Sequence, residues 1–326
     1  MDSEHYHNPY TGQTFFGFFL VLCQRLWLFL SQQLSFADIA SDEIQMLVLI
    51  GISASAGLVG SFLVLRKMTM LANSLSHTIL IGIVLAYLAA YHGLLKDSYE
   101  HGSPLNMQSL LIAAVVMGVL TTFLTEFLTK TGKLQEDASI GIVFTSLFAL
   151  GVILLTVATR NAHIGTEVVM GNVDALQKND CKMAWVIFLM NALLFFLFFK
   201  EYKITTFDPG LAQAFGISIT FFNYLLMVQV SITSVGAFRA VGVLMVLAFI
   251  TGPVLTARLL TYDLKTLLIS SVALGAASSM IGVALARHFL SVYDMALSTG
   301  GIVVCTITVI YIAAILFSPK QGLFVR

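Results

Sequence analysis

Charged residues are scarce in this sequence. Only 10% of its 326 residues are Asp, Glu, Lys or Arg, whereas 58% are hydrophobic. A water-soluble domain usually has about a quarter of its residues charged, so this composition excludes an ordinary soluble protein. A lipid bilayer suits it, because side chains that face lipid should be apolar. The 17 basic and 17 acidic residues cancel, and this balance gives no indication of a nucleic-acid partner.

Proline, cysteine and enzyme motifs are also rare or missing. Five prolines and no low-complexity tract leave no candidate linker. Cys23, Cys181 and Cys305 are odd in number and far apart, so they predict neither a disulfide framework nor a CxxC metal site. Cys23 and Cys305 fall in apolar segments, where we expect small buried hydrophobes. HExxH, GxSxG and GxxxxGK followed by Ser or Thr do not occur. If the chain takes part in ATP-driven transport, the ATPase must therefore be another chain.

Apolar runs recur at about the length, roughly 20 residues, that crosses the hydrocarbon core of a bilayer. We therefore predict an all-α, polytopic membrane helix bundle with about eight to ten transmembrane helices. The candidate segments are 15–34, 46–65, 70–91, 107–129, 138–159, 183–200, 219–237, 240–259, 266–288 and 299–317. Segment 15–34 contains Gln24 and Arg25, so it is either a weak extra span or an amphipathic helix in the interface. We assign residues 1–40 to an N-terminal extension and residues 41–326 to the membrane domain.

Lys and Arg concentrate on one side of the predicted bundle. If the loop with Lys200 and Lys203 is cytoplasmic, ten basic residues fall on that side and six on the other. The ten are Arg66, Lys67, Lys130, Lys133, Lys200, Lys203, Arg258, Lys265, Lys320 and Arg326, and the six are Lys96, Arg160, Lys178, Lys182, Arg239 and Arg287. Cytoplasmic loops carry the excess of Lys and Arg, which favours this orientation. The longest outer loops are then 92–106 and 160–182, with His92, His101 and His163.

Small residues recur four apart within the apolar runs. The pairs are Gly51 with Ser55, Ala56 with Gly60, and Gly275 with Ser279. Such spacing lets helix backbones approach closely in lipid, which predicts a packed bundle. Segment 240–259 contains Gly252 and Pro253, and we expect it to be broken or short.

One histidine falls at membrane depth. His77 lies seven to eight residues into segment 70–91, and Asn73 precedes it by four residues, so both share one face of a helix. Ionisable groups in a membrane usually mark function, and imidazole and amide groups bind first-row divalent ions. The alternative is a histidine that is hydrogen-bonded within the bundle. No acidic residue lies clearly at mid-depth, which weakens a proton-coupled mechanism.

The most polar predicted inner loop is 200–218. Asp208 followed by Pro209 indicates the start of a helix, with the acid as cap and proline in the first turn, and Gly216 fits its end. The sequence thus predicts a helix of about two turns on the cytoplasmic side. Such a helix suits docking to a soluble protein, although a plain connecting helix is an equal alternative.

Several short motifs follow one another along residues 46 to 322. They are Gly60-Ser61-Phe62-Leu63-Val64-Leu65-Arg66, Ser76-His77 with Gly82, Glu136-Asp137-Ala138-Ser139-Ile140-Gly141-Ile142-Val143-Phe144, Met170-Gly171-Asn172, Phe207-Asp208-Pro209 with Ala212 and Gly216, Val241-Gly242-Val243-Leu244, Pro253 with Ala257-Arg258, and Ser318-Pro319 with Gly322. Together they resemble the permease subunits of bacterial ABC importers for zinc, manganese and iron. Each motif alone is weak, but their order and spacing across most of the chain are specific.

The resemblance implies a set of partners. Two permease subunits, alike or paralogous, would form one path, and two ATP-binding subunits would dock on their 207–218 helices. Phe207, Asp208, Pro209, Ala212 and Gly216 would form the ATPase-coupling segment. An extracytoplasmic metal-binding protein would deliver manganese, zinc or iron to the outer loops. The chain would be a multi-pass protein of a bacterial inner (plasma) membrane, with no permanently bound cofactor.

The resemblance also places His77 on the metal path. Asn73 stands where the family often has Asp, and Ile81 stands where it often has Pro. Because Asn supplies no negative charge, attraction for a dication is weaker at this position. Either a partner subunit supplies the carboxylate, or the ion passes with little coordination.

Three other functions remain as alternatives. A secondary metal transporter without an ATPase would need carboxylates at mid-membrane. An ABC permease for a metal chelate would need a wide cavity and no ligand histidine. An intramembrane enzyme is disfavoured by the missing motifs.

Overall fold

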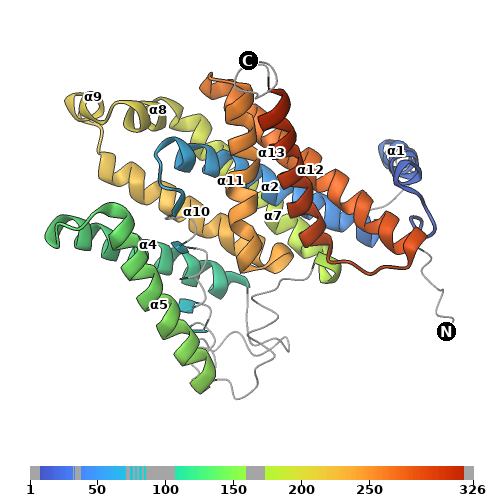
Figure 1. The fold of residues 1–326 in the computed structure, drawn as a ribbon, viewed down its shortest axis with the longest axis horizontal. Coiled ribbons are helices and arrows are strands. Elements are labelled where there is room, and N and C mark those ends of the chain that lie inside the picture. Colours follow the sequence, from blue (N-terminus) through green and yellow to red (C-terminus); the bar gives the residue numbers. More distant parts are fainter. Residues whose placement is uncertain are drawn as a thin grey trace.

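The protein is a bundle of helices (Figure 1). The computed structural model describes residues 8–31, 33, 38–70, 74–75, 78, 81–82, 84–85, 107–158 and 173–318, and these residues contain no strand. The helices are α1 (Phe15–Leu30), α2 (Ser41–Leu65), α4 (Met107–Thr131), α5 (Glu136–Ala158), the short 3-10 helix η3 (Val173–Ala175), α7 (Lys178–Leu197), α8 (Phe199–Phe207), α9 (Pro209–Ala214), α10 (Ile219–Val241), α11 (Val243–Leu260), α12 (Leu264–Tyr293) and α13 (Thr299–Phe317).

Six of the described helices are long and apolar enough to cross a membrane. They are Ser41–Leu65, Asp137–Leu154, Lys178–Leu197, Ile219–Phe238, Leu264–Tyr293 and Thr299–Phe317. The helix over Val246–Leu260 is shorter, as expected, yet α11 continues through Pro253 without a break. The predicted polytopic helix bundle is therefore confirmed in its class. Most of the predicted span 70–91 lies outside the described residues.

Helix α2 forms the centre of the bundle and packs against α7, α10, α11 and α12. Small residues make these contacts close. A Cβ atom added to Gly60 would lie 2.0 Å from the carbonyl oxygen of Ile250 in α11, and one on Gly275 would lie 3.1 Å from the Cβ of Ser53. Close backbone approach of this kind drives helix association in lipid. The packing predicted from the small-residue pairs is thus confirmed at Gly60 and Gly275.

Hydroxyl and amide groups join α2, α7 and α10 inside the bundle. Asn191 of α7 donates from Nδ2 to Oγ of Ser55 at 2.7 Å and to Oγ1 of Thr233 at 2.8 Å. The two hydroxyl groups lie 3.1 Å from each other. All three side chains are fully or almost fully buried, so these bonds replace water in an apolar interior.

The two ends of the bundle differ in their contacts. The α9 end holds the C-termini of α2, α11 and α13 and the N-termini of α10 and α12. At this end, Oγ of Ser318 donates a hydrogen bond to the carbonyl of Leu259 at 2.5 Å. At the α1 end, α2 and α13 begin and α12 finishes. Here Oδ1 of Asp174 accepts bonds from Gln45 at 3.3 Å and Thr299 at 3.2 Å.

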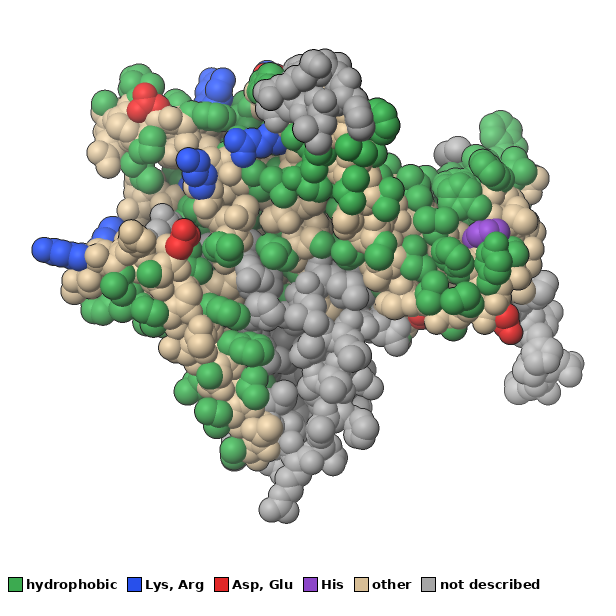
Figure 2. Space-filling model, in the orientation of Figure 1, with side chains coloured by type: hydrophobic (Ala, Val, Ile, Leu, Met, Phe, Trp, Pro, Cys, Tyr) green, Lys and Arg blue, Asp and Glu red, His purple; other side chains and the backbone are tan. Residues whose placement is uncertain are grey.

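Hydrophobic side chains are spread over the visible face of the described residues, and Lys and Arg side chains gather over α8, α11 and the α4–α5 turn (Figure 2). Large exposed apolar side chains occur on α5, α7 and α13, for example Ile153, Phe196 and Val309. Cys23 and Cys305 are also exposed, so the expectation that they are buried is wrong. Their segments are apolar because of the surroundings of the bundle rather than because they lie in its core.

Candidate functional site: the α8–α9 segment

Helix α8 is fixed to the bundle by a buried tyrosine. Tyr202 packs against the rings of Phe62, Phe195 and Phe222, with centroid distances of 5.2, 4.8 and 5.3 Å. Its hydroxyl donates to Oε1 of Gln229 in α10 at 2.6 Å. Aromatic rings contribute large buried areas, and this polar bond satisfies the hydroxyl. Helix α8 is therefore held against α2, α7 and α10.

Arg66 links the end of α2 to α8 and α10. Its Nε donates to Oγ1 of Thr206 at 3.0 Å, its Nη2 donates to Oγ1 of Thr205 at 2.8 Å, and its Nη1 donates to Oδ1 of Asn223. The guanidinium also lies 6.0 Å from the ring centroid of Tyr202. Burial lowers the pKa of Arg66 to about 10, which leaves the side chain charged at neutral pH. A planar guanidinium has several donors in a fixed fork, so one residue can tie three elements together.

The start and end of α9 match the sequence prediction. Oδ1 of Asp208 accepts from the backbone N–H of Leu211 at 2.9 Å, and Pro209 occupies the first turn. At the other end, the N–H groups of Ile217 and Gly216 donate to the carbonyls of Ala212 at 2.9 Å and Gln213 at 3.0 Å. This pair of bonds is a Schellman motif, and it requires the φ of +73° seen at Gly216. The short helix is thus a defined element.

The two faces of the α8–α9 segment differ. Ala212 is completely buried against the rest of the chain. Phe207, Leu211 and Phe215 follow one another at intervals of four residues and are all exposed, Phe215 by 67%. In Figure 1, α8 and α9 lie at the edge of the bundle, where α9 projects from it. These three exposed apolar side chains make this segment a candidate interaction surface.

The coupling residues proposed from the sequence all fall in this segment, but they do different things. Asp208 caps the start of α9, and Pro209 forms its first turn. Gly216 ends the helix, and the buried Ala212 packs it against the rest of the chain. Of the five residues, Phe207 is the one with an exposed aromatic ring. Leu211 and Phe215 were missed by the sequence reasoning, although their four-residue spacing from Phe207 could have identified them. Arg66 was noted only as part of a motif and as a basic residue.

The proposed metal residues His77 and Asn73 lie outside the described residues, as do Met170-Gly171-Asn172. Among the residues that the structure describes, no group of three His, Cys, Asp or Glu side chains is placed to hold a metal ion.

Comparison with known proteins identifies the family. Residues 43–318 match the model of the ABC 3 transport family, which is most of the chain. The chain belongs to this family. The predicted resemblance is thereby confirmed, and the chain is a multi-pass membrane permease.

Two relatives and one solved structure show how far the likeness extends. The "Probable metal transport system membrane protein" of Chlamydia trachomatis is 40% identical over 320 residues, which cover 98% of this chain and 97% of that protein. The "Manganese transport system membrane protein MntD" of Bacillus subtilis is 37% identical over 292 residues, 86% of this chain and 92% of that protein. The structure of "PsaBC from Streptococcus pneumoniae in complex with Fab" superposes with a TM-score of 0.71 at 28% identity, covering 85% of this chain and 91% of that one.

Proposed function

We propose that this chain is the permease subunit of an ABC importer that moves a divalent metal ion into a bacterial cytoplasm. The family assignment supports the architecture, and the name of the relative in Bacillus subtilis, a manganese transport protein, favours manganese over zinc and iron. ATP is hydrolysed by a separate subunit. The chain has about eight to ten spans in the inner membrane, and its basic residues favour a cytoplasmic position for the α9 end.

The observation that carries the proposal is the exposed apolar row on the α8–α9 segment. Phe207 at the end of α8, Leu211 within α9 and Phe215 directly after α9 are exposed, whereas Ala212 of α9 is buried. A soluble ATPase subunit with an apolar groove is a suitable partner, since such grooves bind the exposed apolar side chains of short helices. The exposed rings provide affinity, and the fixed backbone provides orientation.

Force on α9 has a physical route into the bundle. Helix α9 follows α8 through the single residue Asp208, and α8 is bonded to Arg66 at the end of α2. Arg66 also bonds Asn223 near the start of α10. A displacement of the α8–α9 segment by the ATPase would therefore act on α2 and α10 together. Because packed helices are not continuously deformable, such a displacement favours a second arrangement of the bundle.

The metal would pass His77, with Asn73 four residues earlier in the sequence. A neutral imidazole suits manganese, zinc and iron alike, so the ligand type does not select one ion. Binding on this path has to remain weak enough for release. A second permease subunit would complete the path, and an extracytoplasmic binding protein would supply the ion at the α1 end.

A matched pair of alanine variants tests the docking segment. Phe215→Ala removes an exposed ring at the end of α9, and Phe16→Ala removes an exposed ring from α1, at the opposite end of the bundle. The measurements are co-purification of the ATPase subunit and ATP-dependent uptake of radioactive manganese. We expect both to fall in Phe215→Ala and to stay near wild type in Phe16→Ala.

Two results would contradict the proposal. The first is an intact, coupled complex in Phe215→Ala. The second is manganese uptake by vesicles that contain this chain alone, because it would indicate the secondary transporter instead. Competition by free metal ions separates the remaining alternative, a chelate permease, since free ions compete only at a site for free ions.

A further inference from the structure

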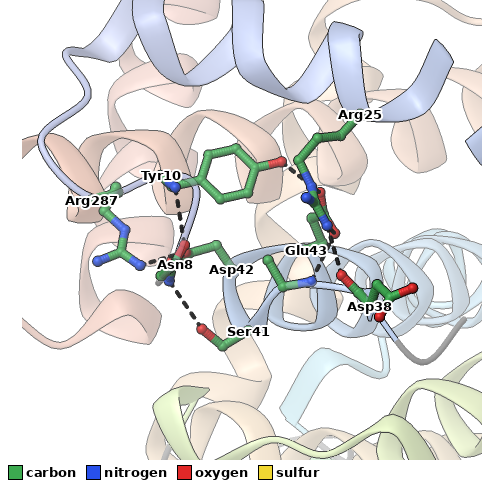
Figure 3. Close-up of polar contacts among 9 residues, drawn as sticks. Asn8, Tyr10, Arg25, Asp38, Ser41, Asp42, Glu43 and Arg287 are labelled. Atoms are coloured by element: carbon green, nitrogen blue, oxygen red, sulfur yellow. Dashed lines mark hydrogen bonds and ion pairs between the residues drawn. The ribbon is translucent and has the colours of Figure 1, made fainter. Parts of the chain in front are cut away.

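The N-terminal extension is fastened to the first turn of α2 by a buried cluster of polar groups, drawn in Figure 3. Glu43 is its hub: Oε1 accepts from the hydroxyl of Tyr10 at 2.7 Å and from Nε of Arg25 at 2.5 Å, and Oε2 accepts from the N–H of Ala40 at 2.9 Å. Burial and the hydrogen bond to Glu43 raise the pKa of Tyr10, so its hydroxyl remains a donor. Paired in this way, the charges of Glu43 and Arg25 are tolerated with little exposure.

Asp42 forms the second half of the cluster. Its Oδ2 accepts from Nδ2 of Asn8 at 2.7 Å and from Nη2 of Arg287 near the end of α12. Helix α1 itself packs against α12. The extension therefore joins α2 and α12 at the α1 end of the bundle.

These contacts fix the level of α1 along the bundle. The ring of Tyr10 packs against that of Phe18 in α1, with centroids 4.7 Å apart, and Arg25 lies seven residues after Phe18 in the same helix. Both Tyr10 and Arg25 reach Glu43, so the middle of α1 is level with the first turn of α2. A helix that spanned the membrane before α2 would instead place Tyr10 at the opposite face. In Figure 1, α1 is accordingly seen nearly end-on, whereas α2 and α12 are seen from the side.

The other face of α1 is apolar and exposed. Phe16, Leu20 and Trp27 are 78%, 68% and 73% exposed, and Cys23 lies between them on the same stripe. Arg25 is the only charged residue of the helix, and it points into the protein. The last turns of the neighbouring α12 carry further exposed apolar side chains: Leu290, Val292 and Tyr293. The stripe on α1 therefore continues the apolar surface that a permease presents to lipid.

We propose that α1 is an interfacial helix that lies in the outer headgroup region of the bilayer and anchors the outer ends of α2 and α12. Its 16 residues extend about 24 Å at 1.5 Å per residue, too short for a hydrocarbon core of about 30 Å. Trp27 suits this depth, because indole rings prefer the membrane–water interface. The placement of α1 on the outer side of the membrane depends on the cytoplasmic position proposed for α9, but its interfacial depth does not.

The fluorescence of Trp27 measures its depth directly. The chain has two tryptophans, so the conservative variant Trp185→Phe leaves Trp27 as the only one. The full-length variant is reconstituted into phosphatidylcholine vesicles whose acyl chains carry bromine near the headgroup, at mid-chain or at the chain end. The matched control is Trp27→Phe, which keeps Trp185. We expect Trp27 to lose most fluorescence to the shallow bromines and progressively less to the deeper ones.

Each other outcome overturns the proposal. Strongest quenching by chain-end bromines would make α1 a span. Quenching by aqueous iodide, without quenching by any brominated lipid, would place the apolar face of α1 in water. Insensitivity to all quenchers would mean that another protein covers it.

A nitroxide on Cys23, with Cys181 and Cys305 changed to serine, gives an independent measurement. We expect it to collide more often with oxygen than with a water-soluble nickel chelate. The same label on Gln33→Cys, an exposed position just after α1, should show the reverse preference. Equal behaviour at both positions contradicts the interfacial placement. Neither readout depends on transport, so a failure here leaves the permease function standing.

Discussion

Arg66 donates a hydrogen bond from Nη2 to Oγ1 of Thr205 over 2.8 Å, although the two residues are 139 positions apart in the chain. The bond joins the end of α2 to α8, and α8 leads directly into α9. A side chain in this place links the proposed ATPase-docking segment to α2, the most buried of the six candidate spans among the described residues.

Replacing Arg66 by lysine should uncouple ATP hydrolysis from metal transport. Arg66→Lys keeps the charge but loses the fork that reaches Thr205, Thr206 and Asn223. Each lost hydrogen bond of a charged group costs about 1.5–3 kcal/mol, so we expect the link to loosen while the ATPase still docks. The measurement is the amount of manganese transported per ATP hydrolysed, which should fall.

Lys67→Asn is the control for that experiment. Lys67 is exposed and has a φ of +60°, a conformation that asparagine tolerates. It should leave the ratio unchanged. An unaltered ratio in Arg66→Lys, with normal protein levels, would show that force does not pass through this residue.

Gly216 should be intolerant of a side chain, although nothing crowds it. No atom lies within 4 Å of a Cβ added there, yet its φ is +73°. A left-handed conformation costs other residues roughly 1–2 kcal/mol. Gly216→Val should therefore deform the end of α9 and reduce co-purification of the ATPase, and Gly216→Asn should do so less. Gly210→Ala adds a methyl group inside α9 at an ordinary helical φ and should have no effect. Equal binding by all three variants would mean that the helix end does not position the contact.

Gly60→Ala should destabilise the whole bundle. The new Cβ would lie 2.0 Å from the carbonyl oxygen of Ile250, a backbone atom that cannot swing away. Overpacking of this kind typically costs about 1–3 kcal/mol, and here α2 and α11 must separate. Thermal unfolding in detergent should show a lower midpoint for Gly60→Ala. Gly141→Ala, where the added Cβ meets nothing within 4 Å, should keep the wild-type midpoint. A variant at Gly60 as stable as the one at Gly141 would mean that the two helices can move apart freely.

The sequence predicted the features that depend on interactions between neighbouring residues. Apolar length predicted the long helices, and the chemistry of Asp208, Pro209 and Gly216 predicted α9 almost to the residue. Contacts between distant segments were not predictable in this way. Arg66 donates hydrogen bonds to Thr206 and Asn223, which are more than a hundred residues away in the sequence. Only the folded bundle brings these residues together.

Arg25 shows a second limit of sequence reasoning. In an apolar run, Arg25 was only an interruption that weakened a span. In the structure it is the partner of Glu43, and this pairing holds α1 against the bundle. Exposed cysteines were mispredicted for a related reason, since apolar surroundings can be lipid as well as core.

His77→Ala should reduce manganese uptake without lowering the amount of protein in the membrane. Even partners that only orient metal ligands cost about 10–100-fold in affinity or activity when removed, so loss of a ligand should cost at least as much. Uptake of radioactive manganese, zinc and iron by cells that express the complete importer provides the measurement. The control is His288→Ala, which removes a half-buried histidine near the end of α12. Wild-type uptake in His77→Ala would remove this residue from the metal path.

Asn73→Asp should strengthen the attraction for the metal ion. The change supplies, four residues before His77, the negative charge that the family often has at this position, and a carboxylate is a better partner for manganese than an amide. We expect a lower KM for manganese, with an unchanged or lower maximal rate, because tighter binding slows release. Gln33→Glu adds the same charge at an exposed position after α1 and controls for a general electrostatic effect on the outer surface. If both variants shift the KM equally, the charge acts from a distance and Asn73 does not contact the ion. If neither variant shifts it, the partner subunit supplies the carboxylate, and the corresponding position of that subunit becomes the one to change.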